Sequence, residues 1–297
     1  MSIDQFVQYL IVGLTDGSIY ALVGLGFTII YAVTRIINFA QGEFVMIGGM
    51  LSYTLATSAG LSIPLSFLVS VLSAAAVGAM MYLFAIRTAR RASVISLIII
   101  TIGFSIFVRG VAAEIWGVSN VRPPFFSGKA PVSLPFVDAV ITPQAIWIIG
   151  TAVVVTLLLH LFLKYTMVGK ALKACAVNPK AAGLVGINAR TMALIAFVLA
   201  AVIGGTSGVV MAPHILASYD MGVMLGLKGF VAASIGGFKN PIATVAGGLL
   251  LGVVENVAVG INWGPFTSSY KHVIALMVLL LILLIKSGRL ASEERAA

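Results

Sequence analysis

The chain has 297 residues, of which 60% are hydrophobic and 9% charged, and its mean hydropathy is +1.12. Soluble domains contain about 25% charged residues, so this composition excludes a soluble domain and predicts a polytopic membrane protein. The single cysteine, Cys175, excludes a disulfide framework or a Cys-based metal site within one chain. The formal net charge of +9 does not indicate nucleic-acid binding, because the cations stand in short segments beside apolar spans.

Apolar segments long enough to cross about 30 Å of hydrocarbon predict an all-α helical bundle, a single transmembrane domain over residues 1–297. In chain order the longer segments are Phe6–Val33, Ile36–Ser58, Ile63–Ile86, Ser93–Ile115, Gln144–Leu163 and Thr191–Met211. Three shorter segments follow: Met224–Gly237, Ile242–Val259 and Val273–Ile285. The first two of these either cross separately or form one re-entrant hairpin that turns at Gly236, Gly237 and Pro241. About eight to nine membrane segments are therefore expected.

The distribution of Lys and Arg predicts the orientation. With the N-terminus outside, thirteen of the eighteen Lys and Arg residues lie on the cytoplasmic face, and four lie opposite: Arg122, Lys129, Lys228 and Lys271. Cytoplasmic loops carry an excess of Lys and Arg, so the imbalance predicts that the N-terminus is outside and the C-terminus inside. Arg109 is expected near the outer end of its span, where its side chain extends to the interface.

The longest non-cytoplasmic connection is residues 116–143, a periplasmic or extracellular loop. Five prolines and two glycines exclude a continuous helix there and predict an ordered but irregular cap. This cap is either a plain surface loop or a docking surface for an external partner. Phe125 and Phe126 beside Arg122 and Lys129 have the mixed aromatic and charged character of a docking surface.

Residues 164–190 form the longest cytoplasmic connection, with five cations and no acidic side chain. A short helix is predicted at its centre, Pro179–Val185. Asn178 is a favourable N-cap, Pro179 suits the first helical position, and Gly186 can adopt the left-handed conformation that ends the helix. A helix this short is not stable alone in water, so a cytoplasmic partner is expected to receive it.

Glycines recur four residues apart within the spans: Gly13 and Gly17, Gly204 and Gly208, Gly222 and Gly226, Gly248 and Gly252. Lipid supplies no hydrophobic force between helices, and small residues allow helix backbones to approach closely. The glycine pairs therefore predict tight helix packing in a compact bundle.

Polar residues inside spans are costly and mark candidate sites in a translocation pathway or gate: Asp16, Asn38, Gln41, Glu43, Glu255 and Asn256. Asn38 follows Arg35 by three residues, so its group is expected within about 10 Å of the cytoplasmic start of the span, away from the midplane. It either ties helices together or lines the pathway. Asp16, Glu255 and Asn256 either face a water-filled vestibule or pair with Lys228 or Lys271.

Enzyme motifs are missing from the sequence: no P-loop, no GxSxG, and no His and Glu at zinc-ligand spacing. We therefore expect no catalytic residue, no metal site and no cofactor or nucleotide bound by this chain.

Three stretches carry a resemblance to a known family: GLTDGSIYALVGLGFTIIYAVTRIINFAQGEFVMIGG, GKALKACAVNPKAAGLVGI and GFVAASIGGFKNPIATVAGGLLLGVVEN. They resemble, in matching order, Liv-type permeases, the first of the two membrane subunits in ABC importers of branched-chain amino acids. The similarity runs from about Phe6 to Ser287.

The resemblance implies a multi-pass protein of the bacterial inner membrane, in contact with lipid. It implies four further subunits: a second homologous permease, identical or different, two cytoplasmic ATPases that use ATP and Mg, and a periplasmic substrate-binding protein. It also implies that residues 164–190 form the coupling loop received by an ATPase. The coupling residues so implied are Gly169, Ala174, Asn178, Pro179, Ala182, Gly183 and Gly186.

Two departures from the family pattern qualify these implications. Family members commonly carry an acidic residue near the start of the short helix, where this chain has Val177 and Asn178, so shape is expected to matter more than charge in the ATPase contact. Many members read NFAHGE where this chain reads NFAQGE, so no proton coupling is expected at Gln41.

Branched-chain or other hydrophobic amino acids are the expected substrates, and urea, short amides and aromatic acids are the alternatives within the same transporter type. A self-sufficient channel or secondary transporter is the rival from a different class, followed by a membrane enzyme.

Overall fold

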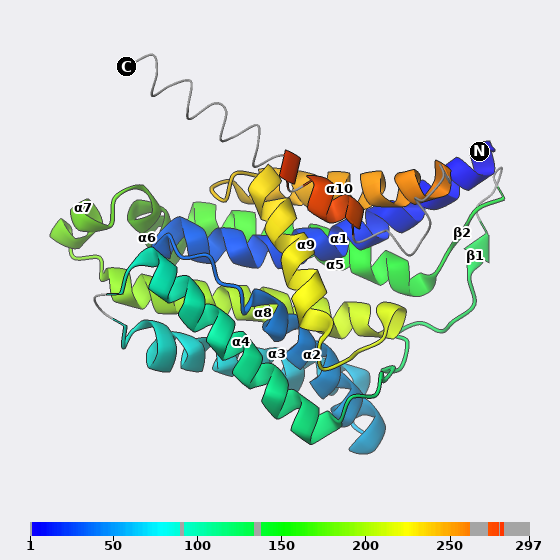
Figure 1. Cartoon of the computed structure of the whole chain (residues 1–297), viewed down its shortest axis with the longest axis horizontal. Helices are drawn as coiled ribbons and strands as arrows, with labels where there is room; N and C mark the ends of the chain where they lie inside the picture. Colours follow the sequence, from blue (N-terminus) through cyan, green and yellow to red (C-terminus); the bar gives the residue numbers. More distant parts are fainter. Residues whose placement is uncertain (1, 90–91, 134–137, 262–272, 279, 282–297) are drawn as a thin grey trace, which may run out of the picture.

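The computed structural model describes residues 2–89, 92–133, 138–261, 273–278 and 280–281. The described chain is an elongated bundle of helices (Figure 1). Its helices are α1 (Ile3–Thr34), α2 (Gln41–Tyr53), α3 (Ile63–Met80), α4 (Val94–Trp116), α5 (Pro143–Tyr165), α6 (Met167–Val177), α7 (Pro179–Leu184), α8 (Ala189–Ile215), α9 (Met221–Ile235) and α10 (Pro241–Ile261). The π-helical turns η1 (Thr54–Ser58) and η2 (Met81–Ile86) continue α2 and α3, and the strands β1 (Val132–Ser133) and β2 (Val140–Ile141) pair antiparallel.

Six of the described helices are long and apolar enough to cross a membrane: α1, α3 with η2, α4, α5, α8 and α10. This confirms a helical membrane protein. Of the predicted segment Val273–Ile285, residues 273–278 and 280–281 are helical, and its other residues lie outside the described part. Lys271 also lies outside it.

The second predicted segment, Ile36–Ser58, begins later than expected, because α2 starts only at Gln41. Arg35 adopts a left-handed conformation with φ 61° and ends α1. The Asn38 side chain then accepts a hydrogen bond from the Ala40 N–H at 3.0 Å. Such a local side-chain bond offers the backbone an alternative to the helix, so residues 36–40 are not helical.

The connection between α9 and α10 is a tight turn, as predicted at Gly236, Gly237 and Pro241. Gly237 and Phe238 both have positive φ, 74° and 59°, and α10 begins at Pro241. α9 packs against α1, α2 and α10, so its 15 residues are shielded by protein on several sides.

α1 and α10 are in close backbone contact through two of the predicted glycine pairs. A Cβ atom added at Gly13 would lie 2.8 Å from the Cα of Val253, and one added at Gly17 would lie 2.8 Å from the Cα of Leu249. On α10, Gly248 and Gly252 meet the backbone of α1 in the same way. The other two pairs contact α2, which confirms the packing role of the spacing.

The two ends of the bundle differ. α6 and α7 lie at one end, and the N-terminus, β1 and β2 lie at the other (Figure 1). We call these the α7 end and the N-terminal end. The connection between α4 and α5 is irregular and ordered, as predicted: the Val140 N–H donates to Gln8 Oε1 at 2.8 Å, and Val121 pairs with Ala217. Residues 134–137 of this connection are outside the described part.

The α1–α10 contact generates a stability prediction. Gly17→Ala places a methyl group against the backbone of α10 and should lower the unfolding free energy of the purified protein by about 1–3 kcal/mol through overpacking. The matched control is Gly103→Ala on α4, where no atom lies within 4 Å of the added Cβ. Denaturation in detergent measures both variants, and equal stability of the two would contradict this account of the contact.

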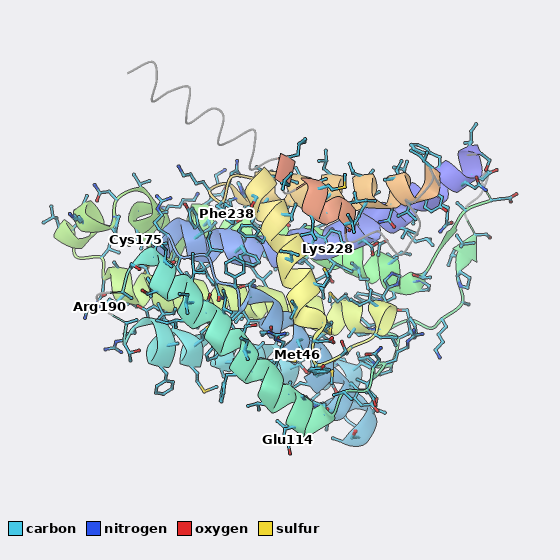
Figure 2. The ribbon with its side chains drawn as sticks, viewed as in Figure 1. Met46, Glu114, Cys175, Arg190, Lys228 and Phe238 are labelled. Carbon is cyan, nitrogen blue, oxygen red and sulfur yellow. The ribbon has the colours of Figure 1, made fainter. Side chains whose placement is uncertain are left out.

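Cys175 generates a prediction about reactivity. The side chain is 1% exposed on the inner face of α6, at the α7 end (Figure 2), and burial raises the pKa of its thiol. Because the thiolate is the reactive form, a maleimide at neutral pH should label the folded protein far more slowly than the protein unfolded in dodecyl sulfate. Mass spectrometry of the two samples measures the difference. Rapid labelling of the folded protein would show that α6 is not packed as described.

Candidate functional site

The short helix α7 forms where the sequence predicts it and ends one residue earlier, at Leu184. The Asn178 side-chain oxygen accepts from the N–H groups of Lys180 and Ala181 at 3.0 and 3.1 Å, which is an N-cap. Gly186 has φ 85°, and the Ile187 N–H donates to the carbonyl of Ala182 at 3.0 Å. The predicted N-cap and the predicted left-handed conformation of Gly186 are thus confirmed.

α7 and the residues that flank it present apolar side chains to the outside of the described chain. Leu184 is 90% exposed, Val177 85% and Val185 75%. The helix projects beyond the neighbouring helices (Figure 1). A cluster of exposed apolar residues at the tip of a projecting element is typical of a protein contact.

The predicted coupling residues separate into two groups. Asn178, Pro179, Gly183 and Gly186 are exposed, whereas Gly169 and Ala182 are buried and Ala174 is half-buried. A Cβ at Gly169 would clash with the backbone of Phe162 and Leu163. Gly169 and Ala182 therefore hold α6 and α7 in place, and the exposed group is available to a partner.

α6 is tied to the end of α1. The guanidinium of Arg35 donates to the carbonyl of Ala176 at 2.8 Å. The contact joins the residue that ends α1 to the last turn of α6, so the two helices are linked at the α7 end.

Asn38, Gln41 and Glu43 are all fully buried, at 0%, 0% and 1% exposure. Gln41 Nε2 donates to the carbonyl of Ala200 on α8 at 3.0 Å, and the Ser105 hydroxyl on α4 donates to Glu43 Oε1 at 2.7 Å. These contacts tie α2 to α8 and α4.

The expected depth of Glu43 and the expected position of Arg109 are both wrong. Ser105, which contacts Glu43, stands halfway along α4, so Glu43 lies near the middle of the bundle. Residues 36–40 reach this depth because non-helical chain advances up to about 3.3 Å per residue instead of 1.5 Å. Arg109 Nε lies 3.4 Å from Glu43 Oε1 with 29% of its side chain exposed, because a buried carboxylate attracts the guanidinium inward.

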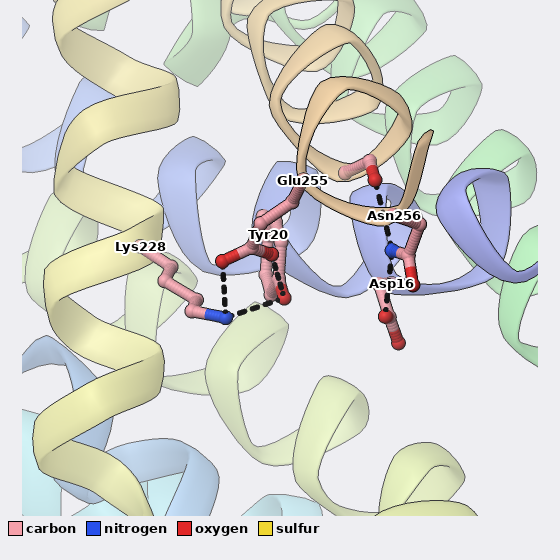
Figure 3. Close-up of polar contacts among 6 residues, drawn as sticks. Asp16, Tyr20, Lys228, Glu255 and Asn256 are labelled. Atoms are coloured by element: carbon pink, nitrogen blue, oxygen red, sulfur yellow. Dashed lines mark hydrogen bonds and ion pairs between the residues drawn. The ribbon is translucent and has the colours of Figure 1, made fainter. Parts of the chain in front are cut away.

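A second buried polar group lies between α1, α9 and α10 (Figure 3). Lys228 Nζ lies 2.7 Å from Glu255 Oε1 and donates to the Tyr20 hydroxyl at 2.8 Å. The Tyr20 hydroxyl in turn donates to Glu255 Oε2 at 2.7 Å. The ion pair confirms one of the two pairings that the sequence left open for Glu255. Lys228 is only 3% exposed, so its expected place on the outer face is wrong.

Asp16 and Asn256 contact each other beside this ion pair. Asn256 Nδ2 donates to Asp16 Oδ2 at 3.0 Å and to the carbonyl of Gly252 at 2.9 Å. Asp16 also lines a cavity of about 350 Å³, together with Tyr20 and Lys228. Asp16 therefore faces a cavity, as one alternative predicted, and is also hydrogen-bonded within the protein.

Sequence reasoning missed one member of this group, Tyr20, and named Lys228 as one of two possible partners. Tyr20 follows Asp16 by four residues, which places both on one face of α1. Lys228 stands inside the apolar run that forms α9, and a lysine inside an apolar helix requires an acidic partner. That rule was the available signal for Lys228, whereas a buried tyrosine has no comparable signal in one sequence.

The apolar helices and the buried ion pairs between them define a polytopic membrane protein with a polar interior. Comparison with known proteins identifies the family. Residues 9–283 match the family model described as "Branched-chain amino acid transport system / permease component". The chain belongs to this family, which confirms the resemblance to Liv-type permeases.

Several relatives align with nearly the whole chain. The high-affinity branched-chain amino acid transport system permease protein LivH of Escherichia coli is 32% identical, over 94% of this chain and 93% of its own length. The corresponding permease protein BraD of Pseudomonas aeruginosa is 31% identical, over 98% of both chains. A probable branched-chain amino acid transport permease protein LivH of Methanocaldococcus jannaschii is 28% identical, over 90% of this chain and 87% of its own length.

The buried ion pair predicts an asymmetric response to mutation. Lys228→Met leaves the Glu255 carboxylate buried without its counter-ion and should destabilise the protein by about 3–5 kcal/mol. Adding Glu255→Gln removes that charge and should restore a large part of the loss. Thermal unfolding of the purified variants measures both steps. A double variant no more stable than Lys228→Met would contradict the pairing.

Proposed function

We propose that this chain is the membrane-spanning permease subunit of an ATP-driven importer of branched-chain or other hydrophobic amino acids. The observation that carries the proposal is the 31–32% identity, over 94–98% of the chain, to permease proteins named for branched-chain amino acid transport. The chain translocates substrate and hydrolyses no ATP. ATP and Mg are used by two cytoplasmic ATPase subunits.

The proposed orientation places the N-terminus outside and the α7 end in the cytoplasm of a bacterial cell, with the chain in the inner membrane. The positive-inside rule supports it. Cations of the α7 end include Lys164, Lys170, Lys173 and Lys180, which precede or belong to α6 and α7. The burial of Lys228 removes one cation from the opposite face and widens the imbalance.

Residues 164–190 serve in this proposal as the coupling loop. α7, with Leu184 and the following Val185 exposed, enters an apolar groove on an ATPase subunit. The neutral cap Asn178 supports a contact based on shape more than on charge. A second homologous permease completes the membrane part, and a periplasmic binding protein delivers substrate to the N-terminal end, next to residues 116–143.

The buried polar residues are proposed as parts of the gate or pathway. Glu43 with Arg109 links α2 to α4 near the middle of the bundle, and Asp16 lines a cavity towards the N-terminal end. Alternating access changes such contacts when nucleotide-driven closure of the ATPases moves α7.

Urea, short amides and aromatic acids remain alternative substrates within the same transporter type. The ligand held by the binding protein separates these substrates. The rival, a self-sufficient channel or secondary transporter, requires uptake by this chain alone. The importer requires an ATPase with Walker motifs to copurify.

Gly183→Glu tests the coupling assignment. No atom lies within 4 Å of a Cβ at Gly183, so the glutamate is accommodated, and it places a charge on the apolar face of α7. We expect loss of leucine uptake by the complete importer and reduced copurification of the ATPase, with normal membrane insertion.

The matched control is Val118→Glu, at a residue 72% exposed beyond the far end of α4. It adds the same charge at the opposite end of the bundle and should leave ATPase copurification unchanged. Unchanged leucine uptake and unchanged ATPase copurification in Gly183→Glu would contradict the coupling assignment.

A further inference from the structure

The cavity beside the Lys228–Glu255 ion pair has the size and lining of a small-ligand site. Its volume of about 350 Å³ lies at the lower end of the range for ligand pockets, about 300–1,000 Å³. It is an open cavity lined by α1, α9, the last residue of α8 with the connection that follows it, and Asn120 of the connection between α4 and α5. The apolar part of its wall consists of Ile19, Ile215, Leu216, Met221, Met224 and Leu225.

Two side chains of opposite charge line this otherwise largely apolar wall. Asp16 comes from α1 and Lys228 from α9 (Figure 3). Ligand pockets combine an apolar lining with a few fixed polar groups that orient the ligand. A wall with one carboxylate and one ammonium suits a ligand that itself carries both charges.

Neighbouring side chains hold both charged groups in position. Asn256 donates to Asp16 at 3.0 Å, which orients the carboxylate. Glu255 lies 2.7 Å from the Lys228 ammonium, and the Tyr20 hydroxyl accepts from it at 2.8 Å. These contacts offset part of the cost of removing the lysine from water, so the charge stays beside the cavity.

We propose that this cavity binds an α-amino acid in transit. The Asp16 carboxylate pairs with the ammonium of the ligand, and the Lys228 ammonium receives its carboxylate. The aliphatic side chain of the ligand lies against the apolar wall, which includes Ile19 and Leu225. The inference rests on the proposed function and narrows it to zwitterionic substrates.

The charges distinguish between the substrate classes that the family leaves open. Urea and short amides carry no charge and gain no ion pair from Asp16 or Lys228. An aromatic acid without an amino group leaves Asp16 facing a second carboxylate, which is repulsive. Only a ligand with both an ammonium and a carboxylate group pairs with both Asp16 and Lys228.

Site-directed labelling of the purified full chain tests this assignment. In a Cys175→Ala background, Met224→Cys introduces a thiol on the cavity wall, and Val118→Cys provides a control thiol outside it. Three probes compete with a maleimide: leucine, 4-methylpentanoate, which lacks the ammonium, and 3-methylbutylamine, which lacks the carboxylate. We expect leucine to slow labelling at position 224 alone, and each analogue to require at least about tenfold higher concentration for the same protection.

Asp16→Asn is the second arm, because asparagine keeps the size of the side chain and an oxygen for Asn256. It should raise the leucine concentration for half-protection at least about tenfold and leave protection by 4-methylpentanoate no weaker. Glu114→Gln, at an exposed residue near the outer end of α4, removes one negative charge elsewhere and should change nothing. Equal protection by leucine and 4-methylpentanoate, or an unchanged leucine concentration in Asp16→Asn, overturns the proposal.

Uptake by the complete importer separates this inference from the proposed function. If the importer takes up leucine while leucine gives no protection at position 224, the site is wrong and the function stands. If leucine protects position 224 as expected while the importer takes up no amino acid, the function is wrong and the site stands.

Discussion

The close backbone contact between α1 and α10 is the constraint on which the polar interior depends. Lipid gives two apolar helices no hydrophobic reason to associate, so their packing relies on small residues that allow close approach. Gly13 and Gly17 on α1 meet the backbone of α10 around Leu249 and Val253. The same contact fixes the register that brings Asp16 to Asn256 and Tyr20 to Glu255. A shift of one residue along α10 would rotate Glu255 by about 100° and break both contacts.

That register also explains how the protein keeps Lys228 inside. An isolated ammonium in the hydrocarbon region costs several kcal/mol, and a single carboxylate costs as much. Together, 2.7 Å apart and bridged by the Tyr20 hydroxyl, the two charges satisfy each other. The glycine contact, which carries no charge, is therefore what makes the charged group possible. α9 depends on it in turn, because its lysine finds its partners only where α1 and α10 are already joined.

The sequence allowed the long helices to be predicted closely, since an apolar run bounded by polar residues has few other solutions in a membrane. α7 was predictable for a different reason: Asn178 and Gly186 act within a few residues of themselves. Two of the failures, the positions expected for Arg109 and Lys228, involved partners distant in sequence. Glu43 draws Arg109 inward from another helix, and Lys228 pairs with Glu255 of α10. The depth of Glu43 was missed because the break at Arg35 depends on one backbone conformation, φ 61°, which a non-glycine residue rarely adopts.

α1 supplies the mechanical link that the proposed function requires. At the α7 end, Arg35, the residue that ends α1, is hydrogen-bonded to α6 through the carbonyl of Ala176. Nearer the N-terminal end the same helix carries Asp16 and Tyr20, about 28 Å and about 22 Å from Arg35 at 1.5 Å per residue. α1 contains no proline and is continuous from Ile3 to Thr34, so it transmits a displacement as one body. In the proposed importer, a movement of α6 that an ATPase imposes through α7 would therefore reach the cavity along α1. The same movement would slide α1 against α10. The hydrogen bonds Asp16–Asn256 and Tyr20–Glu255 both depend on the contact between these two helices.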